Sequence, residues 1–177
     1  HLKVIKVACA YLQAAANPDD DNAMKIILNE PKRGIGKKSI ENIEHIAQSE
    51  GVSFKEALAK QKLLKDKPAK AARKLNKNLN SWESKNVDEP FGFRLRELLI
   101  DAGYWKEISR MDKAEDKIKV LENLLATLNE FSTIENILTT LTERQELKDA
   151  PKPKTASLLE KMSAANITIE DAINVLS

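Results

Sequence analysis

One run of eight residues combines the residue types that bind phosphate in proteins. It consists of Lys32, Arg33, Gly34, Ile35, Gly36, Lys37, Lys38 and Ser39. Four cations and no acid give this run a local charge of +4. Two glycines on either side of an aliphatic residue predict a tight hairpin that a β-carbon at either glycine would obstruct. We expect Ile35 to pack between the helices on each side of the turn.

The expected hairpin presents backbone donors as well as charge. The N–H groups of both glycines and of the next helix's first turn would face outward together, and Ser39 adds a hydroxyl. We therefore interpret residues 32–39 as a helix-hairpin-helix motif that holds a nucleic-acid backbone without reading bases. The alternative is a glycine-rich turn that only joins two helices.

Apolar residues recur at spacings of three and four along most of the chain, which predicts amphipathic helices. Two of these helices would flank the hairpin and position it. Acids at 19–21 suit the first turn of the helix before the hairpin, which favours a helix-capping role over metal binding. Residues 167–177 fit either a helix or a strand. The predicted helices cover about 2–16, 19–29, 38–50, 53 to 59 or 62, 69–83, 91–102, 112–131 (the longest), 132–147 and 155–164. Gly51 suits the end of helix 38–50, and Ser53-Phe54-Lys55-Glu56 is a capping box that opens the next helix. The apolar stripe of helix 69–83 consists of Ala72, Leu75, Leu79 and Trp82.

The composition favours an all-α fold: a compact multi-helix domain that contains the Gly-Ile-Gly turn. The 177 residues include only 5 glycines, 6 prolines and 5% aromatic residues, fewer than all-β folds use. No run approaches the roughly 18 to 20 apolar residues of a membrane-spanning helix. The single cysteine, Cys9, excludes an internal disulfide and lies on an apolar stripe, so we expect it to be buried.

Charge is distributed unevenly along the chain. Residues 1–85 hold 17 basic and 10 acidic residues, a net +7, whereas residues 86–177 hold 12 and 17, a net −5; the two sum to the overall +2. The predicted helix 69–83 carries much of the basic excess. A basic half favours contact with a polyanion on one face, and the alternative is an uneven solvation charge.

Catalytic motifs are missing from the sequence. No Gly-x-x-x-x-Gly-Lys-Ser/Thr loop is present to bind a triphosphate, and no acidic Mg²⁺ motif follows an apolar strand. Two histidines and one cysteine, far apart, supply neither a zinc site nor a nucleophile with its base. We therefore expect no catalytic residue, metal site or cofactor in this chain.

The hairpin and the residues before it resemble a known family. Asn17-Pro18-x-Asp20, a helix, and Pro31-Lys32-Arg33-Gly34-Ile35-Gly36-Lys37 are similar to the 2B subdomain of UvrD/Rep/PcrA-type superfamily 1 DNA helicases. Members carry an Asn-x-x-Asp-Asp run and Thr-Pro-x-Arg-Gly-Ile-Gly. Supporting likenesses are Ala10-Tyr11-Leu12, residues 69–75, and residues 171–177, which resemble a strand of the 2A domain. Two departures are Glu30 in place of threonine and residues 117–121 in place of Arg-x-Glu-Asn-Leu.

The resemblance implies a fragment of an ATP-dependent 3′→5′ DNA helicase that unwinds DNA in repair or replication. It implies a helical 2B-like subdomain over 1–149, and a linker, short helix and tail over 150–177 that lead back to a 2A RecA-like domain. ATP and Mg²⁺ then belong to the parent protein. The implied partners are duplex DNA at a single-strand/double-strand junction and the motor domains of the same chain, without a membrane, in the bacterial cytoplasm and nucleoid. The alternative is a protein-interaction or autoinhibitory module without direct DNA contact.

Overall fold

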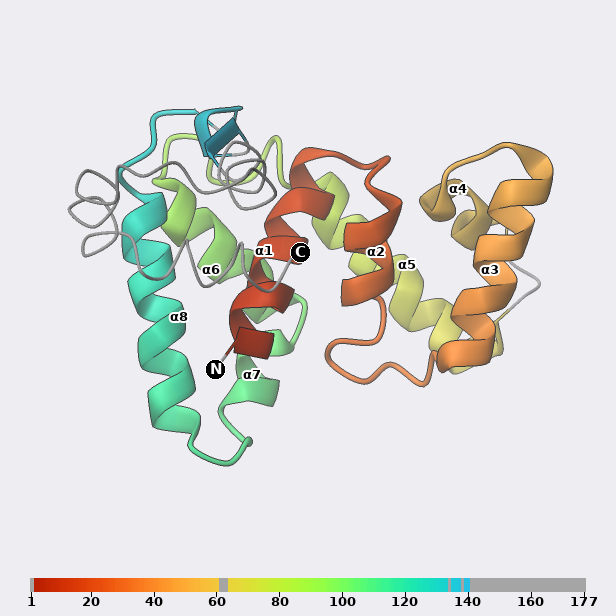
Figure 1. The fold of residues 1–177 in the computed structure, drawn as a ribbon, viewed down its shortest axis with the longest axis horizontal. Coiled ribbons are helices and arrows are strands. Elements are labelled where there is room, and N and C mark those ends of the chain that lie inside the picture. The colour runs from red at the N-terminus through yellow and green to blue at the C-terminus, as the bar shows by residue number, and fades with distance from the viewer. Residues whose placement is uncertain (1, 61–63, 134, 138, 141–177) are drawn as a thin grey trace, which may run out of the picture.

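The computed structural model describes residues 2–60, 64–133, 135–137 and 139–140, and within them the chain is helical without a strand (Figure 1). The predicted all-α class is confirmed. Residues 135–137 and 139–140 are helical as well. The helices labelled in these ranges are α1 (Leu2–Ala16), α2 (Asp21–Ile27), α3 (Lys37–Glu50), α4 (Phe54–Ala59), α5 (Asp66–Asn80), α6 (Phe91–Asp101), α7 (Tyr104–Ile108) and α8 (Ala114–Leu128).

Some helix ends differ from the predicted ones. α2 stops at Ile27 because a turn follows at residues 28 and 29. α8 begins at Ala114 because Lys113 has a left-handed backbone, with φ +50°, and it ends at Leu128 rather than at 131. α8 therefore has 15 residues, as do α1 and α5, and the prediction that it is the longest helix is wrong. The segments predicted over 141–147, 150–154, 155–164 and 167–177 lie outside the described residues.

α1 lies at the centre of the fold and packs against α2, α5, α6 and α8 (Figure 1). Its sequence predicts one apolar stripe, but ten of its 15 residues are buried. A helix with buried residues on every side is typical of a position surrounded by other helices. One of the ten is Tyr11, which holds part of the hairpin described below.

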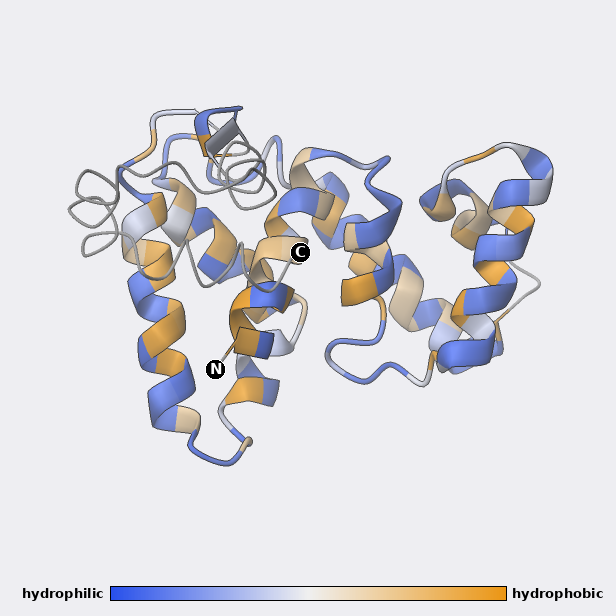
Figure 2. Cartoon of the chain, viewed as in Figure 1, coloured by the Kyte–Doolittle hydropathy of each residue, from blue (hydrophilic) through white to orange (hydrophobic). Residues whose placement is uncertain are grey.

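α6 and α8 pack closely together at Gly92. The backbone N–H of Gly92 donates to Asn129 Oδ1 at 2.8 Å. A β-carbon built on Gly92 would lie 1.9 Å from the carbonyl oxygen of Leu125, so only glycine permits this approach. Hydrophobic and hydrophilic residues alternate in bands along α8 (Figure 2). Its buried residues are Leu121, Leu124, Leu125 and Leu128.

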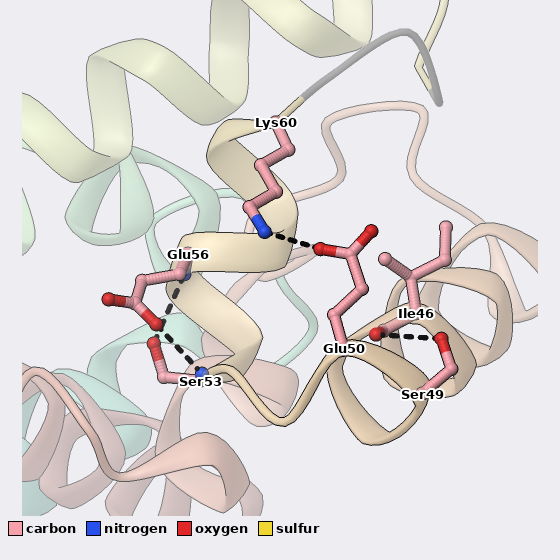
Figure 3. A network of polar contacts seen from close by, with 6 residues as sticks. All are labelled: Ile46, Ser49, Glu50, Ser53, Glu56 and Lys60. Atoms are coloured by element: carbon pink, nitrogen blue, oxygen red, sulfur yellow. Dashed lines mark hydrogen bonds and ion pairs between the residues drawn. The ribbon is translucent and has the colours of Figure 1, made fainter.

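A corner of polar contacts joins α3 to α4 (Figure 3). The capping box expected at the start of α4 is present: Ser53 Oγ accepts from the Glu56 N–H at 3.1 Å, and Glu56 Oε2 accepts from the Ser53 N–H at 3.0 Å. Gly51 ends α3 with a left-handed backbone. Lys60 forms an ion pair with Glu50 across the corner. α4 also packs on α2, so α3 and α4 form a pair of helices held against the rest of the fold through α2.

Cys9 lies inside the core, as its place on the apolar stripe of α1 predicts. Burial raises the pKa of its thiol to about 12. Since only the thiolate reacts with alkylating reagents, the native protein should react very slowly at pH 8. We expect iodoacetamide to label Cys9 only as the fold opens, so that the labelled fraction measured by mass spectrometry follows the urea unfolding curve. Rapid labelling of the native protein at pH 8 would contradict this burial.

Candidate nucleic-acid interface

Residues 28–36 connect α2 to α3 and carry most of the predicted motif. Ile35 is completely buried, as expected of a residue that packs between helices. Gly34 has φ +75°, a left-handed conformation that favours glycine. Gly36 has φ −79°, and nothing lies within 4 Å of the position that a β-carbon would occupy. The expectation that the turn requires glycine therefore holds for Gly34 and is wrong for Gly36.

Arg33, predicted as a phosphate ligand, points into the protein. Its Nη1 donates to the carbonyl oxygens of Ile27 and Leu28 at 2.8 and 3.1 Å. Its Nη2 donates to Tyr11 Oη at 2.8 Å and to the carbonyl oxygen of Ala102 at 3.1 Å. The guanidinium thus lies at the C-terminal ends of α2 and α6, where unpaired carbonyls and the helix dipole stabilise a cation. These contacts occupy the terminal nitrogens, so Arg33 positions the hairpin instead of facing an external phosphate.

Two further side chains fix the backbone of the hairpin. Asn29 Oδ1 accepts from the backbone N–H groups of Arg33 at 2.7 Å and Ile35 at 3.3 Å, so the Ile35 N–H points inward. Tyr11 Oη donates to the carbonyl oxygen of Glu30 at 2.5 Å. Burial raises the pKa of the Tyr11 phenol, and the Arg33 guanidinium offsets part of that rise, so Tyr11 keeps the proton that it donates.

The exposed end of the hairpin holds three lysines and the start of α3. Lys32, Lys37 and Lys38 are exposed. The side chain of Lys37 is 90% exposed, and its ion pair at 3.7 Å with an acid one turn further on is a weak surface pair. Gly36 caps α3 without a side-chain hydrogen bond, and the first turn of α3 contains no acid.

Free backbone donors accompany these lysines. The N–H groups of Lys37 and Lys38 have no hydrogen-bond partner among the residues that the structure describes. They lie at the positive end of the dipole of a 14-residue helix. Ser39 is half-buried, and its N–H is bonded to the carbonyl oxygen of Gly36 at 3.0 Å, so its backbone does not join this set. The surface that remains, Lys32, Lys37 and Lys38 with the start of α3, is called the hairpin surface below.

α5 adjoins the hairpin, a relation that the sequence does not show. A β-carbon on Gly34 would lie 3.5 Å from Pro68 Cγ, so α5 begins beside the turn. Figure 1 shows the starts of α3 and α5 at the same end of the molecule, opposite α7 and α8. The high lysine content of the predicted helix 69–83 was the only sequence signal for this part of the surface. The exposed cations of α5 and its N-cap are Lys65, Lys67, Lys70, Arg73, Lys74 and Lys77.

The acids before the hairpin have structural roles. Asp20 caps α2, with its Oδ1 accepting from the Ala23 N–H at 2.9 Å, as the sequence predicts. Asp21 Oδ1 accepts from the Phe54 N–H at 2.9 Å and so links α2 to the start of α4. In the part of the chain that the structure describes, no three His, Cys, Asp or Glu side chains come together in a way that could hold a metal ion.

The sequence comparison identifies the family. Residues 2–176 match the UvrD-like helicase C-terminal domain family. The chain belongs to this family. Similar members include the ATP-dependent DNA helicase PcrA of Bacillus subtilis (strain 168), 33% identical over 124 residues, and DNA helicase II of Escherichia coli (strain K12), 26% identical over 133 residues. The ATP-dependent DNA helicase UvrD1 of Mycobacterium leprae (strain TN) is 30% identical over 138 residues.

The match to these UvrD-like relatives covers most of this chain and a small part of theirs. The three alignments cover 69%, 72% and 74% of this chain but only 17%, 18% and 18% of the relatives. The aligned part of the chain therefore corresponds to less than a fifth of each relative. Among the described residues, no helix has the length and apolar content to cross a membrane.

The two glycines of the turn should respond differently to the same substitution. We expect Gly34→Ser to destabilise the fold by about 1–2 kcal/mol, because serine resists the left-handed conformation. Gly36→Ser should change the free energy of unfolding by only a few tenths of a kcal/mol in the stabilising direction, since serine is a good helix cap and has room there. Urea unfolding of both variants measures the difference. Equal losses of stability in the two would show that the φ angle at Gly34 does not matter.

Proposed function

We propose that this chain is an accessory, regulatory subdomain of an ATP-dependent 3′→5′ DNA helicase, and that it holds the backbone of duplex DNA near a single-strand/double-strand junction. Residues 1–149 form the 2B-like subdomain, and residues 150–177 lead back to the motor domains of the same protein. ATP and Mg²⁺ act in those motor domains, since this sequence has no Gly-x-x-x-x-Gly-Lys-Ser/Thr loop. The family of the chain and the names of its relatives support the helicase origin.

The observation that carries the DNA contact is the hairpin surface. It combines three exposed lysines with two backbone N–H groups, those of Lys37 and Lys38, from which no described residue accepts. A phosphodiester at this point would receive hydrogen bonds and positive charge, neither of which depends on the base. Arg33 supports the contact from within by fixing the turn to Tyr11 and Ala102.

Salt dependence of duplex binding tests the contact. We expect weak, sequence-independent binding, with a Kd of about 10⁻⁴ to 10⁻⁶ M at physiological salt. Lys37→Ala with Lys38→Ala should lower the slope of log affinity against log salt by up to about two, roughly one for each phosphate that the variant no longer neutralises. The matched control is Lys106→Ala with Lys119→Ala, which removes the same charge from exposed positions on α7 and α8. Equal decreases in the two double variants would show that only net charge matters.

A neutral substitution separates backbone contact from charge. Gly36→Val adds a side chain to the start of α3 where the protein leaves space, and it changes no charge. We expect it to weaken duplex binding by blocking the approach of a phosphate to the N–H groups, while the free energy of unfolding falls by no more than about 1 kcal/mol through the poorer helix cap. Unchanged affinity would place the phosphate on the lysine side chains alone.

Two exposed apolar side chains favour a second candidate function, a protein-interaction or autoinhibitory module. Phe93 and Ile100 are 41% and 45% exposed and lie seven residues apart on α6, hence on one face. Such a face suits contact with another protein surface. Tight binding of isolated motor domains that Phe93→Ser with Ile100→Ser abolishes, together with indifference to duplex DNA, would favour this candidate.

A further inference from the structure

The exposed side of α5 carries a row of lysines with regular spacing. Lys67, Lys70, Lys74 and Lys77 follow one another at intervals of three, four and three residues, so they form one ridge along the helix. All four are exposed. The buried residues of α5 lie on the opposite side and anchor it to the core. They are Ala69, Ala72, Leu75 and Leu79.

The lysine ridge lacks neutralising partners. α5 contains no acid after Asp66, and none of the four lysines forms an ion pair within the part of the chain that the structure describes. Like charges three and four residues apart destabilise a helix. The chain as a whole is nearly neutral, with 29 basic and 27 acidic residues, yet these four lysines stand in one row. Their mutual repulsion therefore lowers the stability of the unbound chain, and a bound polyanion would offset that repulsion.

We propose that the lysine ridge is a second phosphate-binding surface, and that the ridge and the hairpin surface bind the backbone of the same DNA duplex. The inference rests on the proposed function for the identity of the partner. It adds a contact on α5 that makes the interface bipartite and extends it beyond the turn.

The dimensions of the ridge fit a nucleic-acid backbone. Ten residues separate Lys67 from Lys77, which corresponds to about 15 Å along a helix. Phosphates of one DNA strand rise about 3.4 Å per nucleotide along the duplex axis and also wind around it, so the straight ridge can face a few successive phosphates. Because Gly34 lies against Pro68 at the start of α5, the ridge begins beside the hairpin surface. One duplex can therefore contact both.

Four variants of the 177-residue chain test the inference with one duplex over a salt series. They are the ridge variant (Lys70→Ala with Lys74→Ala), the hairpin variant (Lys37→Ala with Lys38→Ala), their combination, and the control (Lys106→Ala with Lys119→Ala). We expect the salt slope to fall by about two in the ridge and hairpin variants and by about four in the combination. The ridge variant should bind about 30-fold more weakly at 0.15 M salt, and the control should match the unsubstituted chain.

The other possible results of this experiment contradict the ridge contact, the hairpin contact or both. A ridge variant that behaves like the control overturns the inference, and weaker binding confined to the hairpin variant leaves the proposed function standing. Weaker binding confined to the ridge variant supports the ridge and rejects the hairpin contact. A control that binds as weakly as the ridge variant overturns both.

A stability measurement distinguishes the loss of a DNA contact from weaker binding that is caused by unfolding of the variant. Lys74→Glu places an acid between Lys70 and Lys77, so it should raise the melting temperature of the free chain while it weakens duplex binding. A fall in both quantities would show that Lys74 supports the fold rather than a ligand, and would count against the ridge.

Discussion

Replacing Gly92 by alanine is expected to destabilise the fold by about 3 kcal/mol or more, because the added carbon has no room between α6 and α8. It would lie 1.9 Å from the Leu125 carbonyl oxygen, 2.7 Å from the Leu125 carbonyl carbon and 2.5 Å from Asn129 Oδ1. Two of these atoms belong to the backbone of α8, which cannot turn aside as a flexible side chain can. The helices must separate, and the hydrogen bond from Gly92 N to Asn129 is strained or broken.

The effect of Gly92→Ala should be visible in thermal unfolding followed by circular dichroism. A destabilisation of about 3 kcal/mol corresponds to a fall in melting temperature of about 6–12 °C for a chain of this size. Gly36→Ala is the matched control, since a β-carbon there meets nothing within 4 Å. It should cost no more than about 1 kcal/mol through the poorer helix cap. A melting temperature for Gly92→Ala within about 2 °C of the unsubstituted chain would show that α6 and α8 do not approach this closely.

Replacing Arg33 by alanine is expected to have the second large effect, a destabilisation of about 3 kcal/mol. The substitution leaves the carbonyl oxygens of Leu28 and Ala102 without the donor that they have in this part-buried site, whereas the carbonyl oxygen of Ile27 keeps the Glu30 N–H at 3.0 Å. Each buried polar group left unpaired costs about 1–3 kcal/mol. The Tyr11 hydroxyl loses its donor as well. Arg33→Lys should recover only part of the stability, because one ammonium cannot reach carbonyls at the ends of both α2 and α6 as the planar guanidinium does.

Lys32→Ala is the control for Arg33→Ala, since it removes the same charge from the adjacent exposed position and should change stability by less than about 0.5 kcal/mol. Urea unfolding of the three variants measures these differences. If Arg33 were a phosphate ligand, Arg33→Ala would instead leave the unfolding midpoint unchanged and lower the salt slope of duplex binding by about one.

Local spacing in the sequence was enough to predict the helices and several of their ends. Asp20 caps α2, Gly51 ends α3, and Ser53 with Glu56 opens α4, each through contacts within a few residues. The apolar stripe of α5 is buried as predicted, from Ala72 to Leu79, and so is Trp82 after it. These features could be predicted because their physical causes lie within one or two helical turns.

The prediction was less complete where a residue's surroundings come from distant parts of the chain. α1 has one stripe of apolar spacing, yet it is buried on every side because α2, α5, α6 and α8 surround it. The end of α8 at Leu128 leaves Asn129 outside the helix, where its side chain accepts from Gly92. Periodicity cannot report such neighbours, since it describes only one element at a time.

The candidate interface likewise has some features that the sequence predicts and others that only the tertiary structure shows. The sequence by itself predicted a turn between two helices at Gly34-Ile35-Gly36, the burial of Ile35 and the cationic composition of residues 32–39 and 69–83. It predicted the same role for both glycines, and only the structure shows that Gly34 alone has a left-handed backbone. Only the tertiary structure decided which cations face outward. Arg33 turns inward because Tyr11 and Ala102, 22 and 69 residues away in the chain, bring acceptors to it. α5 joins the surface because packing sets Pro68 against Gly34. The number of charged residues is a property of composition. The direction in which each charged side chain points depends on which carbonyls and helices the fold assembles around it.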